Sequence, residues 1–187
     1  MVHLSNRVTY WREVTQADLI TFTVWGENLR PHRKGSLLDV RLLAEVDGEL
    51  CWEGTSTYLA SGVHTPGEPP PREEFGEVPD LPGLHTWMLP ADAGRAYARA
   101  SGDANPIHTS KLAAKAFGFS RPIIHGMYSA ARALTEVGTP PVPFEWWVDF
   151  VKPLLLPGRA QLVFGAADAQ EPGSVDYVLR GGEKLHL

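Results

Sequence analysis

The segment SGDANPIHTS, residues 101–110, places an acid, an amide, a proline and an imidazole close together. The acid is Asp103 and the imidazole is His108. Pro106 disfavours a helical residue before it and favours a bend, which would let both side chains converge on one water molecule. A carboxylate and an imidazole that share a water can exchange its protons, a contribution of about 10²–10⁴ in rate. The same residue types are also common in turns without any catalytic role.

A second segment, RPIIHGM over residues 121–127, places His125 and Gly126 where a helix is predicted to begin. The Gly126 N–H would then have no acceptor within the helix, and the helix dipole would add partial positive charge. A thioester oxygen could accept a hydrogen bond from this group as negative charge develops on it. Removing one donor of this kind costs roughly 2.7–4 kcal/mol of barrier. The local alternative is a glycine needed for tight packing beside a histidine that starts the helix.

Three helices are predicted around these motifs, over residues 90–101, 110–119 and 125–138. Ser110 is placed to cap the second helix. The third ends at Gly138, a residue typical of helix C-terminal caps. Its apolar stripe is predicted to consist of Met127, Ala130, Ala131, Leu134 and Val137.

Strands are predicted on both sides of the helical region, from β-branched and aromatic residues and from alternation. They cover residues 7–14, 18–29, 37–46 and 49–60, and then 144–154, 159–168, 174–181 and 183–187. Asp47-Gly48 predicts a hairpin turn. Residues 62–84 contain six of the sixteen prolines and predict an extended linker. The predicted division is therefore 1–61, a linker over 62–84, and 85–187.

Composition narrows the function classes. The net charge of −5 argues against a general nucleic-acid-binding protein, which normally has a basic face. Cys51 is the only cysteine, so an internal disulfide and a cysteine-based metal site are excluded. The first residues lack the apolar core of a signal peptide, and every apolar run is far shorter than the ~20 residues of a membrane helix. We expect a soluble, cytoplasmic protein with no membrane or nucleic-acid partner.

Together, the two motifs resemble the signature of the MaoC-like, or R-specific enoyl-CoA hydratase, family. The resemblance is carried by YARASGDANPIHTSKLAAKAFGFSRPIIHGMYSAARAL, in which residue types and gaps both agree with the family pattern. It implies an α+β hot-dog fold, a curved antiparallel sheet wrapped around a long helix, here residues 125–137. It covers residues 85–187 well.

The resemblance also implies a reaction, the reversible addition of water to a trans-2-enoyl thioester to give an (R)-3-hydroxyacyl thioester. Asp103 and His108 would activate the water and return a proton to the α-carbon, and the Gly126 N–H would polarise the thioester carbonyl. No metal or redox cofactor is implied, because the coenzyme A or acyl-carrier-protein arm belongs to the substrate. The residues implied in substrate binding are Ser101, Asn105, Arg121, His125 and Met127, of which His125 would also shape the turn into the helix.

Residues 3–60 resemble the strands of the degenerate first half of two-repeat members, so residues 1–61 are expected to form a partial hot-dog repeat. The helix that precedes these strands in a complete repeat is not recognisable, and the first sheet would need another partner to cover its apolar face. A homodimer or hetero-oligomer formed through sheet pairing is expected from the resemblance. Two other functions stay open: a hot-dog acyl-thioesterase, and a non-catalytic acyl-binding or structural subunit of a hydratase complex.

Overall fold

The structure, a computed structural model, describes residues 1–71, 81–166, 174–181 and 184–187. The chain divides into two compact units, each of which combines two stretches of sequence. Unit 1 consists of Met1–Gly76 and Pro140–Asp149, and unit 2 consists of Glu77–Thr139 and Phe150–Leu187.

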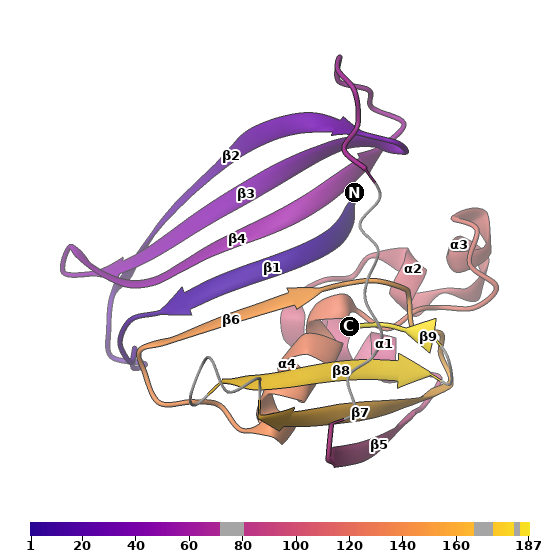
Figure 1. The fold of residues 1–187 in the computed structure, drawn as a ribbon. Coiled ribbons are helices and arrows are strands. Elements are labelled where there is room, and N and C mark those ends of the chain that lie inside the picture. The colour runs from indigo at the N-terminus through magenta and orange to yellow at the C-terminus, as the bar shows by residue number, and fades with distance from the viewer. Residues whose placement is uncertain (72–80, 167–173, 182–183) are drawn as a thin grey trace. The chain divides into compact units, whose positions relative to one another are not determined.

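Unit 1 contains a five-stranded antiparallel sheet in the order β2-β3-β4-β1-β6 (Figure 1). Its strands are β1 Val2–Tyr10, β2 Ile20–His32, β3 Gly35–Val46, β4 Glu49–Ser61 and β6 Phe144–Asp149. The predicted hairpin turn between β3 and β4 is confirmed, since Asp47 and Gly48 have φ angles of 53° and 79°. Two successive positive φ angles are the requirement of the turn that best matches the twist of two paired strands.

Strand β6 pairs along its whole length with β1, from Ser5 opposite Asp149 to Tyr10 opposite Phe144. The strand predicted over 144–154 therefore ends five residues early, at Asp149. Local alternation indicates a strand here, but it does not identify the strand's partner, which lies at the other end of the chain. The predicted division at 61 and 84 stays a prediction, because residues 72–80 of the linker lie outside the described residues.

Unit 2 contains an antiparallel sheet in the order β5-β7-β8-β9 together with all the described helices. Its strands are β5 Gly83–Leu89, β7 Gly158–Ala166, β8 Val175–Gly181 and β9 Lys184–Leu185. Its helices are α1 Ala93–Ser101, α2 Pro106–Thr109, α3 Lys111–Ala116 and α4 Gly126–Val137. Residues 167, 168 and 183 of the predicted strands lie outside the described residues. Strand β5, which lies beside the proline-rich segment, was not predicted, because it is short and depends on pairing with β7.

Helix α4 contacts strand β8 within unit 2 (Figure 1). Its buried residues are Ser129, Ala130 and Ala133, whereas Ala131 is exposed. The predicted stripe is therefore wrong at Ala131. The side of the helix that packs inward is centred on Ser129, Ala130 and Ala133, small residues that let the helix approach its neighbours closely. The cap at Gly138 is confirmed, with a φ of 96° and an N–H that donates to the Leu134 carbonyl oxygen. In the described part of the chain, every helix is too short or too polar to span a membrane.

The core of unit 2 is formed by large apolar side chains from its strands. Trp87, Leu162 and Leu179 are fully buried. The predicted cap of α3 is also confirmed, since the Ser110 hydroxyl accepts a hydrogen bond from the Ala113 N–H at 3.4 Å. The cap fixes the start of α3 directly after α2, the helix that carries His108.

Candidate active site

The first motif forms a series of side-chain-stabilised turns. The Ser101 hydroxyl accepts a hydrogen bond from the Asp103 N–H at 3.2 Å, and Asp103 Oδ1 accepts one from the Asn105 N–H at 3.1 Å. Asn105 Oδ1 in turn accepts one from the Ile107 N–H at 3.3 Å and caps α2. The turn interpretation of this segment is therefore correct as a description of its backbone. The turns place His108 on α2, facing the second motif.

The second motif lies as an extended segment between α2 and the chain that precedes β7. The Ile123 N–H donates to the Ile107 carbonyl oxygen at 3.2 Å, and the Ile124 N–H donates to the Leu154 carbonyl oxygen at 2.9 Å. An isolated β-bridge pairs Ile123 with Leu155. These main-chain bonds fix the two motifs relative to each other within unit 2.

His108 is buried, with 9% of its surface exposed. Its Nδ1 lies 2.9 Å from the Ile123 carbonyl oxygen. A carbonyl can only accept, so Nδ1 carries the hydrogen and Nε2 of the neutral ring keeps a free lone pair. Burial lowers the pKa of His108 below its usual value of 6.5. The imidazole is therefore neutral at neutral pH and can accept a proton at Nε2.

His125 adds a second link between the motifs. Its Nε2 donates to the Asp103 carbonyl oxygen at 2.9 Å, and its ring stacks on His108 with centroids 3.7 Å apart. The Tyr97 ring lies 4.9 Å from the His125 ring on a tilted plane. With 2% of its surface exposed, His125 is locked between these partners. Its Nδ1 is buried and has no hydrogen-bond partner among the described residues.

The Asp103 side chain is 54% exposed, so the carboxylate reaches solvent beside the buried histidines. One carboxylate oxygen of Asp103 and one ring nitrogen each of His108 and His125 lie within 4.8 Å of one another. A single water can bridge two groups at this separation, because each of its hydrogen bonds spans about 2.8 Å. The structure thus brings together the acid and the imidazole that the sequence analysis paired.

The same three side chains could offer ligands to a metal ion. A carboxylate and two imidazoles suit zinc in type. However, each ring already donates one N–H to a carbonyl oxygen. The nitrogens left to bind a metal ion are therefore His108 Nε2 and His125 Nδ1, which belong to two stacked rings. The expectation that no metal is needed stays a prediction.

Gly126 is the first residue of α4, with His125 as the N-cap. Its N–H has no acceptor inside the helix and lies at the positive end of the dipole of a 12-residue helix. A Cβ at this position would lie 2.8 Å from two ring carbons of Phe150, closer than side-chain atoms normally approach. The position therefore excludes a side chain, and it places a main-chain donor next to the histidine cluster.

Two predicted substrate-binding residues lie outside this cluster. Arg121 is exposed and its guanidinium donates to the Pro157 carbonyl oxygen at 3.1 Å. Met127 is half-buried in the first turn of α4. Ser101 and Asn105 belong to the cluster's turns, where their oxygens bind main-chain groups.

Three residues contribute to the site in ways that were not predicted from the sequence: Tyr97, Ile123 and Gly94. Tyr97 contacts both His125 and the Tyr128 ring, whose centroid lies 5.5 Å away. Burial, and then the charge of Asp103, raise the pKa of Tyr97, so its hydroxyl stays protonated. Ile123 contributes only its main chain, and Gly94 only its lack of a side chain, since a Cβ there would overlap the His108 carbonyl oxygen. Tyr97 carried a signal as a matching position of the motif, whereas the main-chain roles had none.

Residues 71–171 match the family model described as MaoC like domain. The chain belongs to this family. It is 36% identical over 186 residues to 3-hydroxyacyl-thioester dehydratase X of Mycobacterium tuberculosis, covering 98% of this chain and 64% of the relative. The chain thus spans less than two thirds of that relative's length. A separate match of 52% identity over 44 residues, 24% of this chain and 2% of the other, is to fatty acid synthase subunit beta of Gibberella zeae.

The solved structure of HtdX from Mycobacterium tuberculosis matches 99% of this chain and 73% of its own, with a TM-score of 0.81 and 34% identity. A MaoC-like dehydratase from Phytophthora capsici matches 99% of this chain and 68% of its own, with a TM-score of 0.77. At 20% identity, the second likeness shows the fold alone. The predicted fold class, an α+β hot-dog fold, is confirmed.

Proposed function

We propose that this protein catalyses the reversible hydration of trans-2-enoyl thioesters, or the reverse dehydration of (R)-3-hydroxyacyl thioesters, in fatty-acyl metabolism. The observation that carries the proposal is the convergence of the Asp103 carboxylate and the neutral His108 imidazole beside the Gly126 N–H. The family membership and the name of the 36%-identical relative, a 3-hydroxyacyl-thioester dehydratase, support it.

In the proposed reaction, His108 Nε2 accepts a proton from a water molecule as the water oxygen bonds to the β-carbon of the enoyl thioester. The Asp103 carboxylate accepts a hydrogen bond from the other O–H of the same water, which stays bonded to its oxygen, and so orients the attacking lone pair. The electron pair of the double bond moves to the α-carbon and the thioester oxygen. The proton taken by the His108–Asp103 pair is then delivered to the α-carbon, which completes the hydration. Proton transfer by positioned side chains of this kind contributes about 10²–10⁴ in rate.

Gly126 would act at the thioester oxygen. Negative charge develops there as water adds, and the Gly126 N–H, at the positive end of α4 and without an acceptor inside the helix, is a donor suited to it. The ring of Phe150 leaves no room for a side chain at this position, so none stands beside the N–H. A main-chain donor on a helix needs no rearrangement at the moment of reaction.

His125 would act as a positioning residue. It holds the Asp103 main chain through Nε2 and supports the His108 ring by stacking. Ser101 and Asn105 would shape the Asp103 turn, and Arg121 and Met127 would meet the substrate. No metal or redox cofactor takes part in this scheme. Oligomerisation through sheet pairing and a cytoplasmic location stay predictions.

The proposal is tested by following crotonyl-CoA hydration through the loss of enoyl absorbance. The purified chain should hydrate this substrate, and D103N, which keeps the shape of the side chain, should lower kcat by about 10²–10⁴. An unchanged rate in D103N would remove Asp103 from the mechanism. Release of free thiol without hydration would identify a thioesterase, and activity in neither assay would favour a non-catalytic subunit.

A further inference from the structure

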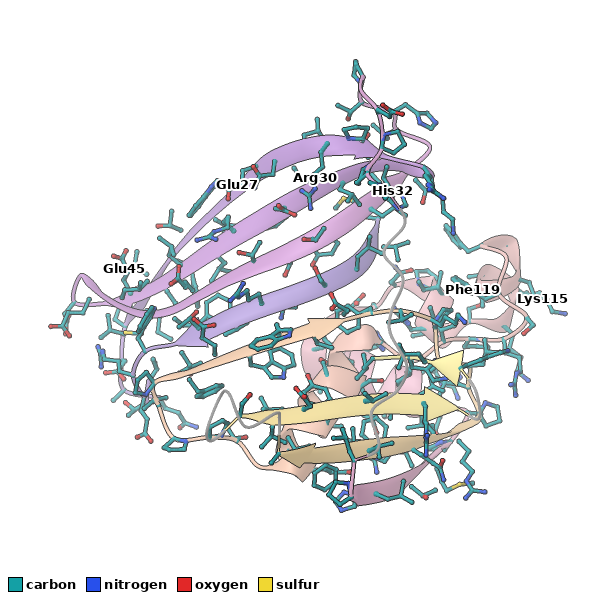
Figure 2. All side chains as sticks on the ribbon, viewed as in Figure 1. Glu27, Arg30, His32, Glu45, Lys115 and Phe119 are labelled. Carbon is teal, nitrogen blue, oxygen red and sulfur yellow. The ribbon has the colours of Figure 1, made fainter. Side chains whose placement is uncertain are left out.

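Helix α3 and the residue after it expose two large apolar side chains and two lysines. Leu112 is 82% exposed and Phe117 is 69% exposed. Lys111 and Lys115 are exposed on the same short helix, and Figure 2 shows the side chain of Lys115 there. Only Ala114 of this helix is buried. We call the group Lys111, Leu112, Lys115 and Phe117 the α3 surface.

The charged residues near α3 in the sequence are all of one sign. Residues 104–135 contain Lys111, Lys115, Arg121 and Arg132 and no acidic residue, in a chain whose net charge is −5. Arg132 is paired with Glu136 at 2.8 Å. Within the described parts of the chain, neither lysine of the α3 surface forms an ion pair. The positive charge of the α3 surface is therefore available to a partner.

The stability of α3 does not account for this arrangement. Lys111 and Lys115 are one turn apart, where like charges weaken a helix. Lys111 also opens the helix, where a positive charge opposes the helix dipole. Leucine and phenylalanine side chains that remain in contact with water do not stabilise the helix. Large apolar side chains exposed together on one short segment are typical of an interaction site.

The α3 surface is joined directly to the proposed catalytic residues. His108 lies on α2, and Ser110, which ends α2, also caps α3. The main chain between them is held by the Ser110 N–H, which donates to the Pro106 carbonyl oxygen at 2.9 Å. A partner bound at α3 would therefore be held beside the segment that carries His108.

We propose that the α3 surface binds an acidic protein that carries the acyl thioester on a flexible arm, namely an acyl carrier protein. This rests on the proposed function, from which the thioester substrate follows. The lysines would meet carboxylates of the carrier, and Leu112 and Phe117 would be covered by its apolar residues. Coenzyme A is the less suitable occupant, because its phosphates could meet the lysines but would leave these two side chains in water.

The test compares one acyl group on two carriers, crotonyl-CoA and crotonyl loaded on the acyl carrier protein of Mycobacterium tuberculosis. K111E/K115E should lower kcat/KM for the carrier-protein substrate about tenfold and change it less than about twofold for crotonyl-CoA. L112S/F117S should show the same selectivity. R33E/K34E, with the same charge change in the exposed turn after β2, is the matched control and should alter neither rate. Added salt should weaken only the carrier-protein reaction of the wild type.

Equal losses on both substrates, or no loss on either, would overturn the docking proposal. Circular dichroism identifies any variant that is unfolded, and the second double variant then decides the result. Binding of unacylated holo-carrier protein, followed by fluorescence anisotropy, separates this proposal from the proposed function, since it needs no catalysis. Carrier binding that K111E/K115E abolishes supports docking even if hydration is absent, whereas hydration of crotonyl-CoA without carrier binding leaves only the proposed function standing.

Discussion

The two units of this protein differ in their helices, since all the described helices belong to unit 2. In unit 2, helix α4 contacts the sheet, and Trp87, Leu162 and Leu179 are fully buried. In unit 1, the sheet has an edge strand, β2, on which apolar side chains are exposed. Phe22, Val24 and Leu29 are 61%, 56% and 60% exposed.

The buried polar groups of the two units also have different hydrogen-bond partners. The buried polar contacts of unit 1 run from strand to strand, as at Asp39, which accepts hydrogen bonds from Arg30 and Thr57 at 2.9 and 2.8 Å. In unit 2, His108 and His125 are removed from water and held in fixed orientations by main-chain carbonyls. Within the described residues, a carboxylate and two imidazoles are brought together only in unit 2, at Asp103, His108 and His125. We therefore expect substitutions in unit 1 to change stability and substitutions at the histidine cluster to change catalysis.

The largest effect is expected for H108N. Asparagine can place a donor near the position of Nδ1 and keep the bond to the Ile123 carbonyl oxygen, but it cannot accept a proton as a base. We expect kcat for crotonyl-CoA to fall by about 10²–10⁴ with the fold intact. H186N is the matched control, because His186 is also buried and Nδ1 also bonds a carbonyl oxygen, that of Lys152, at 3.0 Å. A comparable loss of kcat in H186N would contradict a specific role for His108.

The next effect is expected for G126A. The added methyl would lie 2.8 Å from the Phe150 ring, so the ring or the helix start must shift. Overpacking of this kind costs about 1–3 kcal/mol of unfolding free energy, and kcat should fall because the main-chain donor moves. Urea unfolding and the hydration assay measure the two effects. In unit 1, G26A would meet Leu38 at 3.4 Å, an ordinary contact, and should leave both quantities close to wild type.

A similar loss of stability without a loss of activity is expected for D39N. The substitution weakens the hydrogen bonds that the buried carboxylate accepts from Arg30 and Thr57, at a cost of about 1–3 kcal/mol. Urea unfolding should show this loss, while kcat and KM stay unchanged at temperatures where the variant is folded. D103N, whose side chain is largely exposed, should show the reverse pattern. If D39N lowered kcat in the folded state, the separation of roles between the units would fail.

The smallest effect is a shift in pH dependence. Because burial lowers the pKa of His108, the acid limb of kcat/KM should lie below pH 6.5. The groups facing this ring are Asp103, His125 and the Ile123 carbonyl. Above 6.5 the ring is neutral in folded and unfolded chains. As the pH falls below 6.5, His108 takes up a proton in the unfolded chain before it does so in the folded chain. The free energy of unfolding therefore decreases as the pH falls from 6.5 toward the lowered pKa. An acid limb above 6.5 would be inconsistent with a buried neutral base.

Local features were predicted well from the sequence. The Asp47-Gly48 hairpin, the Ser110 cap and the end of α4 at Gly138 each follow from a few neighbouring residues and are confirmed. Features that depend on distant partners were not predicted. Strand β5 is defined by its pairing with β7, and β6 pairs with β1 from the other end of the chain. The inward face of α4 was wrong at Ala131, because packing against neighbouring elements sets the rotation of a helix.

The sequence by itself determined the residue types of the candidate site, the turns of its first motif and the family. Its Asp, Asn and Pro residues bend the chain through contacts of two or three residues, which need no partner elsewhere. Only the tertiary structure decided the state of these groups. The Ile123 carbonyl selects the His108 tautomer, the His125 ring stacks on it, and the Phe150 ring excludes a side chain at Gly126. Burial and orientation arise from groups far apart in the chain, and so local patterns do not reveal them.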